Sequence, residues 1–118
     1  MEKNITVRLT ARLFAEEKCY GPGVEQLLKA VEKHRSLRAA AASMSMAYSK
    51  AWSIIRAAEQ GFGCKLLHST IGGAGGGGAV LTDEARQIMD AYGEYCRRLN
   101  EYGQTLFGEL FGFCAKGE

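Results

Sequence analysis

The fold is decided by residues 36–60, which read SLRAAAASMSMAYSKAWSIIRAAEQ. Ser36 is a good N-cap for a short helix over 37–43, whose alanines favour helix and let another helix approach closely. Residues 44–46 interrupt this pattern and predict a tight turn. Helical spacing resumes over 48–60, with an inner face made of Ala51, Ile54, Ile55 and Ala58. A helix, a tight turn and a second helix form a unit that fits the major groove of DNA.

The outer face of the 48–60 helix carries short or charged hydrogen-bonding side chains. Arginine and lysine can read guanine edges, whereas serine and tyrosine can bond to a phosphate or a base. We therefore expect five side chains of this helix to contact DNA, namely Tyr48, Ser49, Lys50, Ser53 and Arg56.

Two short strands separated by a glycine run follow this helix. Residues 65–70 predict the first strand and residues 79–81 the second, with Gly61 ending the helix before them. Such a strand–loop–strand is expected to form a wing, whose bare glycine amides can approach DNA phosphates. The expected wing contacts are Gly73, Gly75, Gly76 and Gly77.

The flanking segments predict a hairpin and a long helix. Residues 5–13 alternate apolar and polar side chains, which predicts a strand that pairs with a short strand at 19–20. Helical spacing at Val24, Leu27, Leu28 and Val31 predicts an amphipathic helix. Thr82 is expected to cap a long helix that ends at Gly103.

The run from Tyr48 to Trp52, followed by the glycine run and Ala79-Val80-Leu81-Thr82, resembles the ModE-like group of LysR-type winged-helix proteins. The resemblance covers roughly residues 20–102. It implies an α+β fold: a winged helix-turn-helix with an N-terminal β-hairpin and a long C-terminal dimerisation helix. It also implies a transcriptional regulator whose partners are double-stranded DNA and a second copy of the chain, with Trp52 as a packing residue.

The chain departs from the family pattern at several positions. Ala74 stands where the family often has a basic residue in the wing, and His68 where it often has an acid. Ala47 replaces the usual serine N-cap, which costs up to ~1 kcal/mol unless Ser45 caps the helix instead. Because the chain ends soon after the long helix, we expect no molybdate-binding modules.

Length and charge fit one winged-helix domain over 1–118, divided into a hairpin (1–20), a helix-turn-helix with wing (21–82) and a C-terminal helix with an apolar tail (83–118). The net charge of +2 is unevenly spread, because residues 36–82 carry four bases and one acid whereas 83–118 carry four bases and seven acids. A mildly basic middle suits nucleic-acid contact.

The remaining residue types give no sign of an enzyme. The four cysteines are unevenly spaced and the two histidines lack partners at ligand spacing, so we expect free thiols, no metal, no cofactor and no catalytic residue. No stretch is long enough for a membrane span, and we expect a cytoplasmic protein. The identity of any small-molecule effector does not follow from the sequence.

Two other interpretations remain open. The chain could keep the fold as a protein-interaction module without DNA reading, or bind a small oxyanion through its glycine amides. The spacing Gly73-x-Gly75-x-x-Gly78 formally matches a dinucleotide fingerprint, but a strand follows it where that motif needs a helix.

The apolar tail with Phe107, Phe111 and Phe113 is expected to be covered in a dimer rather than to anchor a membrane.

Overall fold

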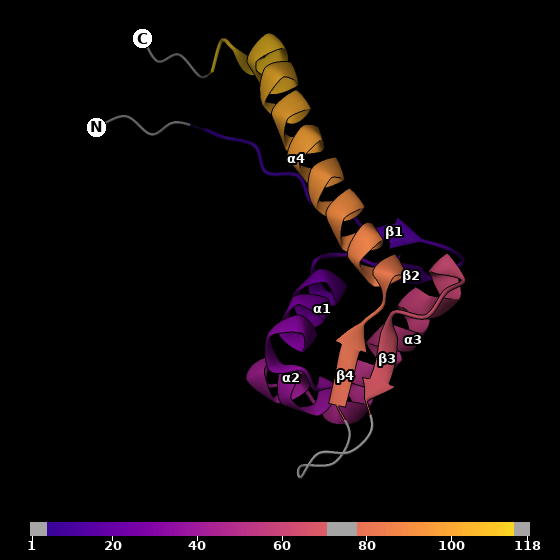
Figure 1. Ribbon diagram of the computed structural model, residues 1–118. Coiled ribbons are helices and arrows are strands. Elements are labelled where there is room, and N and C mark those ends of the chain that lie inside the picture. Colours follow the sequence, from indigo (N-terminus) through magenta and orange to yellow (C-terminus); the bar gives the residue numbers. More distant parts are fainter. Residues whose placement is uncertain (1–4, 71–77, 115–118) are drawn as a thin grey trace.

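A computed structural model describes residues 5–70 and 78–114 of the chain. In chain order these residues form β1 (Leu13–Phe14), β2 (Lys18–Tyr20), α1 (Pro22–His34), α2 (Leu37–Ser43), α3 (Tyr48–Phe62), β3 (Leu67–Thr70), β4 (Gly78–Leu81) and α4 (Asp83–Phe111). Figure 1 shows a body built from α1 to α3 and the two hairpins, from which α4 projects as a long rod. The predicted α+β fold is confirmed.

The core lies between the three helices of the body and β2. Leu27, Leu28 and Ile55 have no exposed surface, because the apolar positions of α1 and α3 repeat every three or four residues and turn inward together. Tyr20 is equally buried, and its ring packs edge-on against Phe62 and Tyr92, with centroid distances of 5.8 and 5.0 Å. Tyr20 therefore ties the N-terminal hairpin to both α3 and α4.

Two predicted N-caps are confirmed, at the starts of α2 and α4. Ser36 Oγ accepts a hydrogen bond from the Ala39 amide at 3.0 Å, and Thr82 Oγ1 accepts one from the Ala85 amide at 3.0 Å. Arg35 ends α1 in the left-handed conformation with φ of 60°. The amide of Arg35 then bonds to the carbonyl of Val31 at 2.7 Å, which satisfies one of the last carbonyls of the helix.

The prediction of a strand over 5–13 is wrong for most of that segment. Only Leu13–Phe14 pairs with β2, and residues 5–12 instead run alongside α4 (Figure 1). The side chain of Asn100 replaces a neighbouring strand, because its Oδ1 accepts from the Leu9 amide at 2.8 Å and its Nδ2 donates to the Leu9 carbonyl at 2.9 Å. Tyr92 Oη donates to the Ala11 carbonyl at 2.7 Å. The alternation of apolar and polar residues over 5–13 thus belongs to an extended segment that packs on a helix.

Two predicted helix ends are also wrong. Helix α3 continues past Gly61 to Phe62, and Gly63, with φ of 73°, is the left-handed residue that ends it. Helix α4 continues past Gly103 to Phe111, and Gly103 lies buried beneath Leu9, where a Cβ would come within 2.7 Å of Leu9 Cδ1. This glycine makes room for the N-terminal segment and does not break the helix.

Candidate nucleic-acid interface

Helices α2 and α3 are joined by a tight turn that is held by three backbone hydrogen bonds. The amides of Met44 and Met46 bond to the Ala41 carbonyl at 3.0 and 2.9 Å, and the Ser45 amide bonds to the Ala42 carbonyl at 3.0 Å. Ala40 and Ala41 are buried in α2, as Ala51 is in α3, so the two helices can pack closely. Ser45 adopts φ of 54° and does not cap α3, which begins after Ala47 without a side-chain cap.

All five residues predicted to contact DNA from α3 are exposed. They are Tyr48, Ser49, Lys50, Ser53 and Arg56. The opposite side of the helix carries Ala51, Ile55 and Ala58, each with no exposed surface, so packing in the core fixes which side of α3 faces solvent. Their contact with DNA itself stays a prediction.

Strands β3 and β4 form the antiparallel hairpin expected for the wing, with Leu67 opposite Leu81 and Thr70 opposite Gly78. The hairpin is fastened to the loop between α1 and α2, because the Ala79 amide donates to the Arg35 carbonyl at 3.0 Å. The predicted wing contacts Gly73, Gly75, Gly76 and Gly77 lie outside the described residues.

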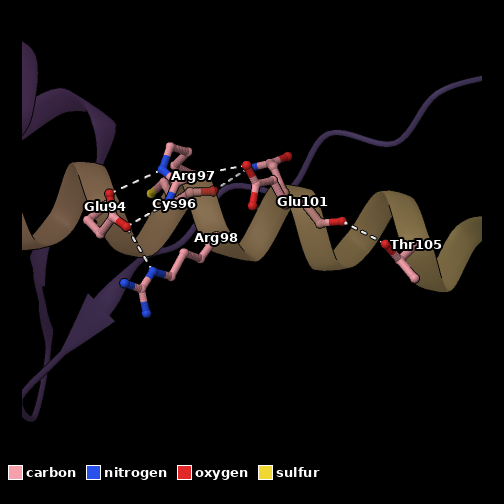
Figure 2. A network of polar contacts seen from close by, with 7 residues as sticks. Glu94, Cys96, Arg97, Arg98, Glu101 and Thr105 are labelled. Atoms are coloured by element: carbon pink, nitrogen blue, oxygen red, sulfur yellow. Dashed lines mark hydrogen bonds and ion pairs between the residues drawn. The ribbon is translucent and has the colours of Figure 1, made fainter.

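The bases of the middle segment are unpaired within the part of the chain that the structure describes. Its five ion pairs use Lys29, Arg86, Arg97 and Arg98, and none uses Arg38, Lys50, Arg56 or Lys65. By contrast, Arg97 and Arg98 of α4 form ion pairs with acids of the same helix (Figure 2). Their hydrogen bonds lower the pKa of Glu94 to about 2. The positive charge of the middle segment is therefore free for an anionic partner.

Comparison with known proteins places this arrangement in a family. The sequence profile of the bacterial regulatory helix-turn-helix proteins of the lysR family matches residues 26–86, which run from α1 through the wing to the start of α4. The chain belongs to this lysR family.

Individual relatives refine the assignment within the lysR family. The chain is 32% identical over 88 residues to the DNA-binding transcriptional dual regulator ModE of Escherichia coli strain K12, covering 75% of this chain and 32% of that protein. Over 88 residues it is 30% identical to the transcriptional regulator ModE of Haemophilus influenzae, with the same coverage of each chain. Over 67 residues it is 34% identical to the molybdenum-pterin-binding protein MopB of Rhodobacter capsulatus, covering 57% of this chain and 25% of that protein.

These relatives confirm the ModE-like winged-helix DNA-binding domain predicted from residues 48–52 and 72–82. The chain spans between a quarter and a third of the length of the curated relatives that it matches. The match therefore concerns the winged-helix part of those proteins.

Within this lysR-type domain, two further bases lie beside α3, Arg38 and Lys65, which were not among the predicted contacts. Arg38 of α2 lies over the Tyr48 ring, with its guanidinium carbon 4.1 Å from the ring centre. Arg56 lies over the Trp52 ring at 5.3 Å, and Tyr48 and Trp52 themselves meet edge to face at 6.4 Å. Lys65 lies just before β3 and is exposed. The available signal was charge, since these residues are the other bases of the basic middle segment.

The described residues also limit other kinds of site. Across 5–70 and 78–114, no three histidine, cysteine or acidic side chains gather where they could hold a metal ion. None of the helices in these ranges is long and apolar enough to cross a bilayer. All four cysteines are free thiols, as predicted.

Proposed function

We propose that this chain is a sequence-specific DNA-binding transcriptional regulator of the ModE-like type. The observation that carries the proposal is the outer side of α3, where hydrogen-bonding side chains are exposed opposite a buried apolar side. A major groove about 12 Å wide accepts one helix, and side chains on the outer side of that helix reach the base edges. On this proposal the chain acts by binding and not by catalysis.

The unpaired positive charge beside α3 supports the same proposal. A large share of the affinity of a protein for DNA comes from neutralised phosphates, which carry no sequence information. Lys50 and Arg56 are exposed, and neither belongs to an ion pair of the described residues. We expect these two side chains to supply affinity, and Ser49 and Ser53 to supply discrimination between bases.

Selection of bound duplexes from a random pool tests the proposal directly. The expected result is one enriched sequence, which the full chain then binds more tightly than a scrambled duplex of the same composition. Ser53→Ala should reduce that preference, since it removes a hydroxyl that can bond to a base edge. Lys50→Ala should instead weaken binding to both duplexes.

The same experiment separates this function from its alternatives. Absence of duplex binding at low salt would contradict DNA reading and leave a protein-interaction module that keeps the winged helix. Binding without any enriched sequence would leave a nonspecific DNA-binding protein. Calorimetry with molybdate, sulfate and phosphate in the absence of DNA tests for an oxyanion carrier, which should show no heat of binding on our proposal.

A second copy of the chain is part of the proposal, and α4 is the surface that supports it. Along α4, Ile88, Tyr95 and Tyr102 recur every seventh residue, and Leu99 and Leu106 repeat at the same interval beside them. Tyr95 is 56% exposed and Tyr102 65%, although both have large apolar rings. The ion pairs of Glu94, Arg97 and Glu101 lie along another side of this helix. Apolar stripes at heptad spacing are the usual seam between two helices.

The stripe continues onto the body of the molecule. A cavity of about 420 Å³ opens where α4 leaves the body, and Leu13, Phe62, Ile88 and Tyr95 contribute to its apolar wall. Exposed apolar surface of this extent marks an interaction site. With a second copy packed on it, the two reading helices would be related by a two-fold axis and would bind two half-sites one or more helical turns apart.

We also propose that this winged-helix domain by itself does not sense molybdate. About two thirds or more of each relative's length has no counterpart in the matched region, and the matched region is the winged helix. Molybdate should therefore leave the affinity of this chain for its selected duplex unchanged. A change in that affinity on addition of molybdate would contradict this part of the proposal.

A further inference from the structure

A polar groove of about 480 Å³ lies between the N-terminal half of α3 and the base of the wing. Its walls come from α2, α3, β3 and β4, and they include two cationic side chains, Arg38 and Lys65. Tyr48 and Trp52 form the side of the groove that belongs to α3. Because Tyr48 lines the groove and is also one of the exposed residues predicted to contact DNA, the groove adjoins the outer face of the reading helix.

Arg38 is oriented by an aromatic ring and not by an acid. Its guanidinium carbon lies 4.1 Å from the centre of the Tyr48 ring. Stacking on an exposed ring leaves the N–H groups at the guanidinium edge available for other acceptors. No carboxylate of the described residues forms an ion pair with this arginine. The Tyr48 ring therefore orients Arg38 without neutralising its positive charge.

The peptide group that follows Lys65 is held by two hydrogen bonds. Thr82 Oγ1 donates to the Lys65 carbonyl at 2.7 Å, and the next amide, that of Leu66, donates to Glu59 Oε2 at 2.9 Å. Glu59 is the acid that lines the groove, and this bond engages one of its oxygens with the backbone. The ammonium of Lys65 stays exposed and outside the ion pairs of residues 5–70 and 78–114.

We propose that this groove holds a phosphate of the DNA backbone, bound between Arg38 of α2 and Lys65 at the base of the wing. This proposal rests on the proposed function. It adds the site that holds the DNA backbone beside the bases contacted by α3. Planar guanidinium and flexible ammonium groups are the two side chains that bind phosphate best.

The exposure of both cations favours a backbone phosphate over a free oxyanion. Two hydrated surface cations gain little from one small anion, because water and salt screen the attraction. A polyanion releases condensed counterions as each phosphate is neutralised, so the same two cations then contribute to affinity. A backbone phosphate and a free oxyanion would present similar tetrahedral oxygens to the groove, and the experiment below distinguishes between them.

The test is the salt dependence of duplex binding by the full chain. Fluorescence anisotropy measures the affinity for the selected and the scrambled duplex at each salt concentration. Replacing both cations, Arg38→Gln together with Lys65→Gln, should reduce the slope of log affinity against log salt by about 0.9, the value for one phosphate contact on duplex DNA, and each single replacement should reduce it by part of that amount. The ratio of affinities for the two duplexes should not change. Circular dichroism of each variant verifies the fold.

Matched controls remove the same charges elsewhere. Arg98→Gln removes an arginine of α4 that pairs with Glu94, and Lys29→Gln removes a lysine of α1 that pairs with Glu25. Both should leave the slope at the wild-type value. If the groove variants behave like these controls while the wild type still binds DNA, the groove proposal is overturned and the proposed function stands.

The aromatic support of Arg38 has its own readout. Tyr48→Leu removes the ring and should lose part of the contribution of Arg38 to the slope. In the Arg38→Gln background, Tyr48→Leu should then have a smaller effect than in the wild type. Fully additive effects of the two changes would overturn the positioning role of this ring.

Calorimetry with inorganic phosphate and molybdate tests the other source. On our proposal neither ion gives a measurable heat below millimolar concentration. Tight binding of either ion that is abolished by Arg38→Gln would assign the groove to a free oxyanion and overturn the backbone assignment. Failure of the wild type to bind any duplex would instead count against the proposed function itself.

Discussion

Gly78 lies where the wing meets the loop between α1 and α2, and its lack of a side chain lets the two approach. A Cβ at this position would come within 2.7 Å of both the Arg35 carbonyl oxygen and Thr70 Oγ1. Gly78→Ala should therefore lower the free energy of unfolding by about 1–3 kcal/mol, as overpacking does elsewhere. Gly93→Ala is the matched control, because no atom lies within 4 Å of its added Cβ and a helix interior prefers alanine by about 0.5–1 kcal/mol. Urea unfolding measures both, and an unchanged midpoint for Gly78→Ala would contradict the packing argument.

Ala47 precedes the reading helix without offering it a side-chain cap. Its backbone is extended, with φ of −64° and ψ of 145°, which is the conformation that a capping serine needs. Ala47→Ser should let a hydroxyl accept from the amides of the first turn and raise the free energy of unfolding by about 1 kcal/mol. Ser36→Ala should have the opposite effect of similar size, since it removes the cap that bonds to the Ala39 amide. If Ala47→Ser leaves the urea midpoint unchanged, the first turn of α3 has no capping deficit.

At the scale of elements, the N-terminal segment is held to α4 by side-chain amides in place of a neighbouring strand. Asn100→Ala removes both hydrogen bonds to Leu9, each of which contributes about 0.5–1.5 kcal/mol. We expect faster hydrogen exchange at the Leu9 amide and a smaller free energy of unfolding. Asn100→Asp keeps the acceptor for that amide and should protect it partly, and Gln104→Ala, which affects only the Val7 carbonyl, should leave it protected. Equal exchange in all three variants would show that the segment is held in another way.

The contact between α4 and the N-terminal segment also predicts a response to alkaline pH. Burial raises the pKa of Tyr92 to about 12, whereas an unfolded tyrosine titrates near pH 10. Its contribution to stability is therefore complete below about pH 10 and is lost as the pH rises to about 12, because the unfolded chain releases the proton first. Tyr92→Phe should lower stability at neutral pH, by losing the bond to the Ala11 carbonyl, and make the alkaline fall shallower. Part of the fall remains in this variant, since burial also raises the pKa of Tyr20.

The elements that the sequence predicts correctly are those with local causes. Ser36 and Thr82 cap the amides three residues ahead of them, and the buried positions of α1 and α3 follow helical spacing. The errors come from long-range contacts, since Leu9 bonds to a residue 91 positions away and Gly103 is covered by that same leucine. The exposed face of α3 was predictable for the same local reason. The stacking of Arg38 on Tyr48 depends on how α2 and α3 cross, which residue patterns do not specify.

At the scale of the whole molecule, the two proposed contact surfaces lie apart. The four unpaired bases of residues 36–82 lie on α2, on α3 or just before β3, whereas α4, which carries the exposed rings of Tyr95 and Tyr102, leads away from the body (Figure 1). The molecule extends 62 Å along its longest axis, and a helix of 29 residues accounts for roughly 43 Å of that at 1.5 Å per residue. This separation lets one part of the chain bind a second copy while the other binds DNA.

The apolar stripe of α4 gives the last prediction, because a charge placed in it should disrupt the proposed dimer. Tyr102→Glu puts a carboxylate in the middle of the stripe, where a second copy would have to desolvate it, and should weaken dimerisation at least about tenfold, or about 1.4 kcal/mol. Gly108→Glu adds the same charge on the face of Arg97 and Glu101, where an added Cβ meets nothing, and should leave the dimer intact. Sedimentation equilibrium measures both, and the Tyr102→Glu chain should bind a single half-site as the wild type does but lose the extra affinity for a two-half-site duplex. A wild-type chain that stays monomeric at high concentration would refute the assignment of α4, and an unaffected dimer in Tyr102→Glu would move the interface to another surface.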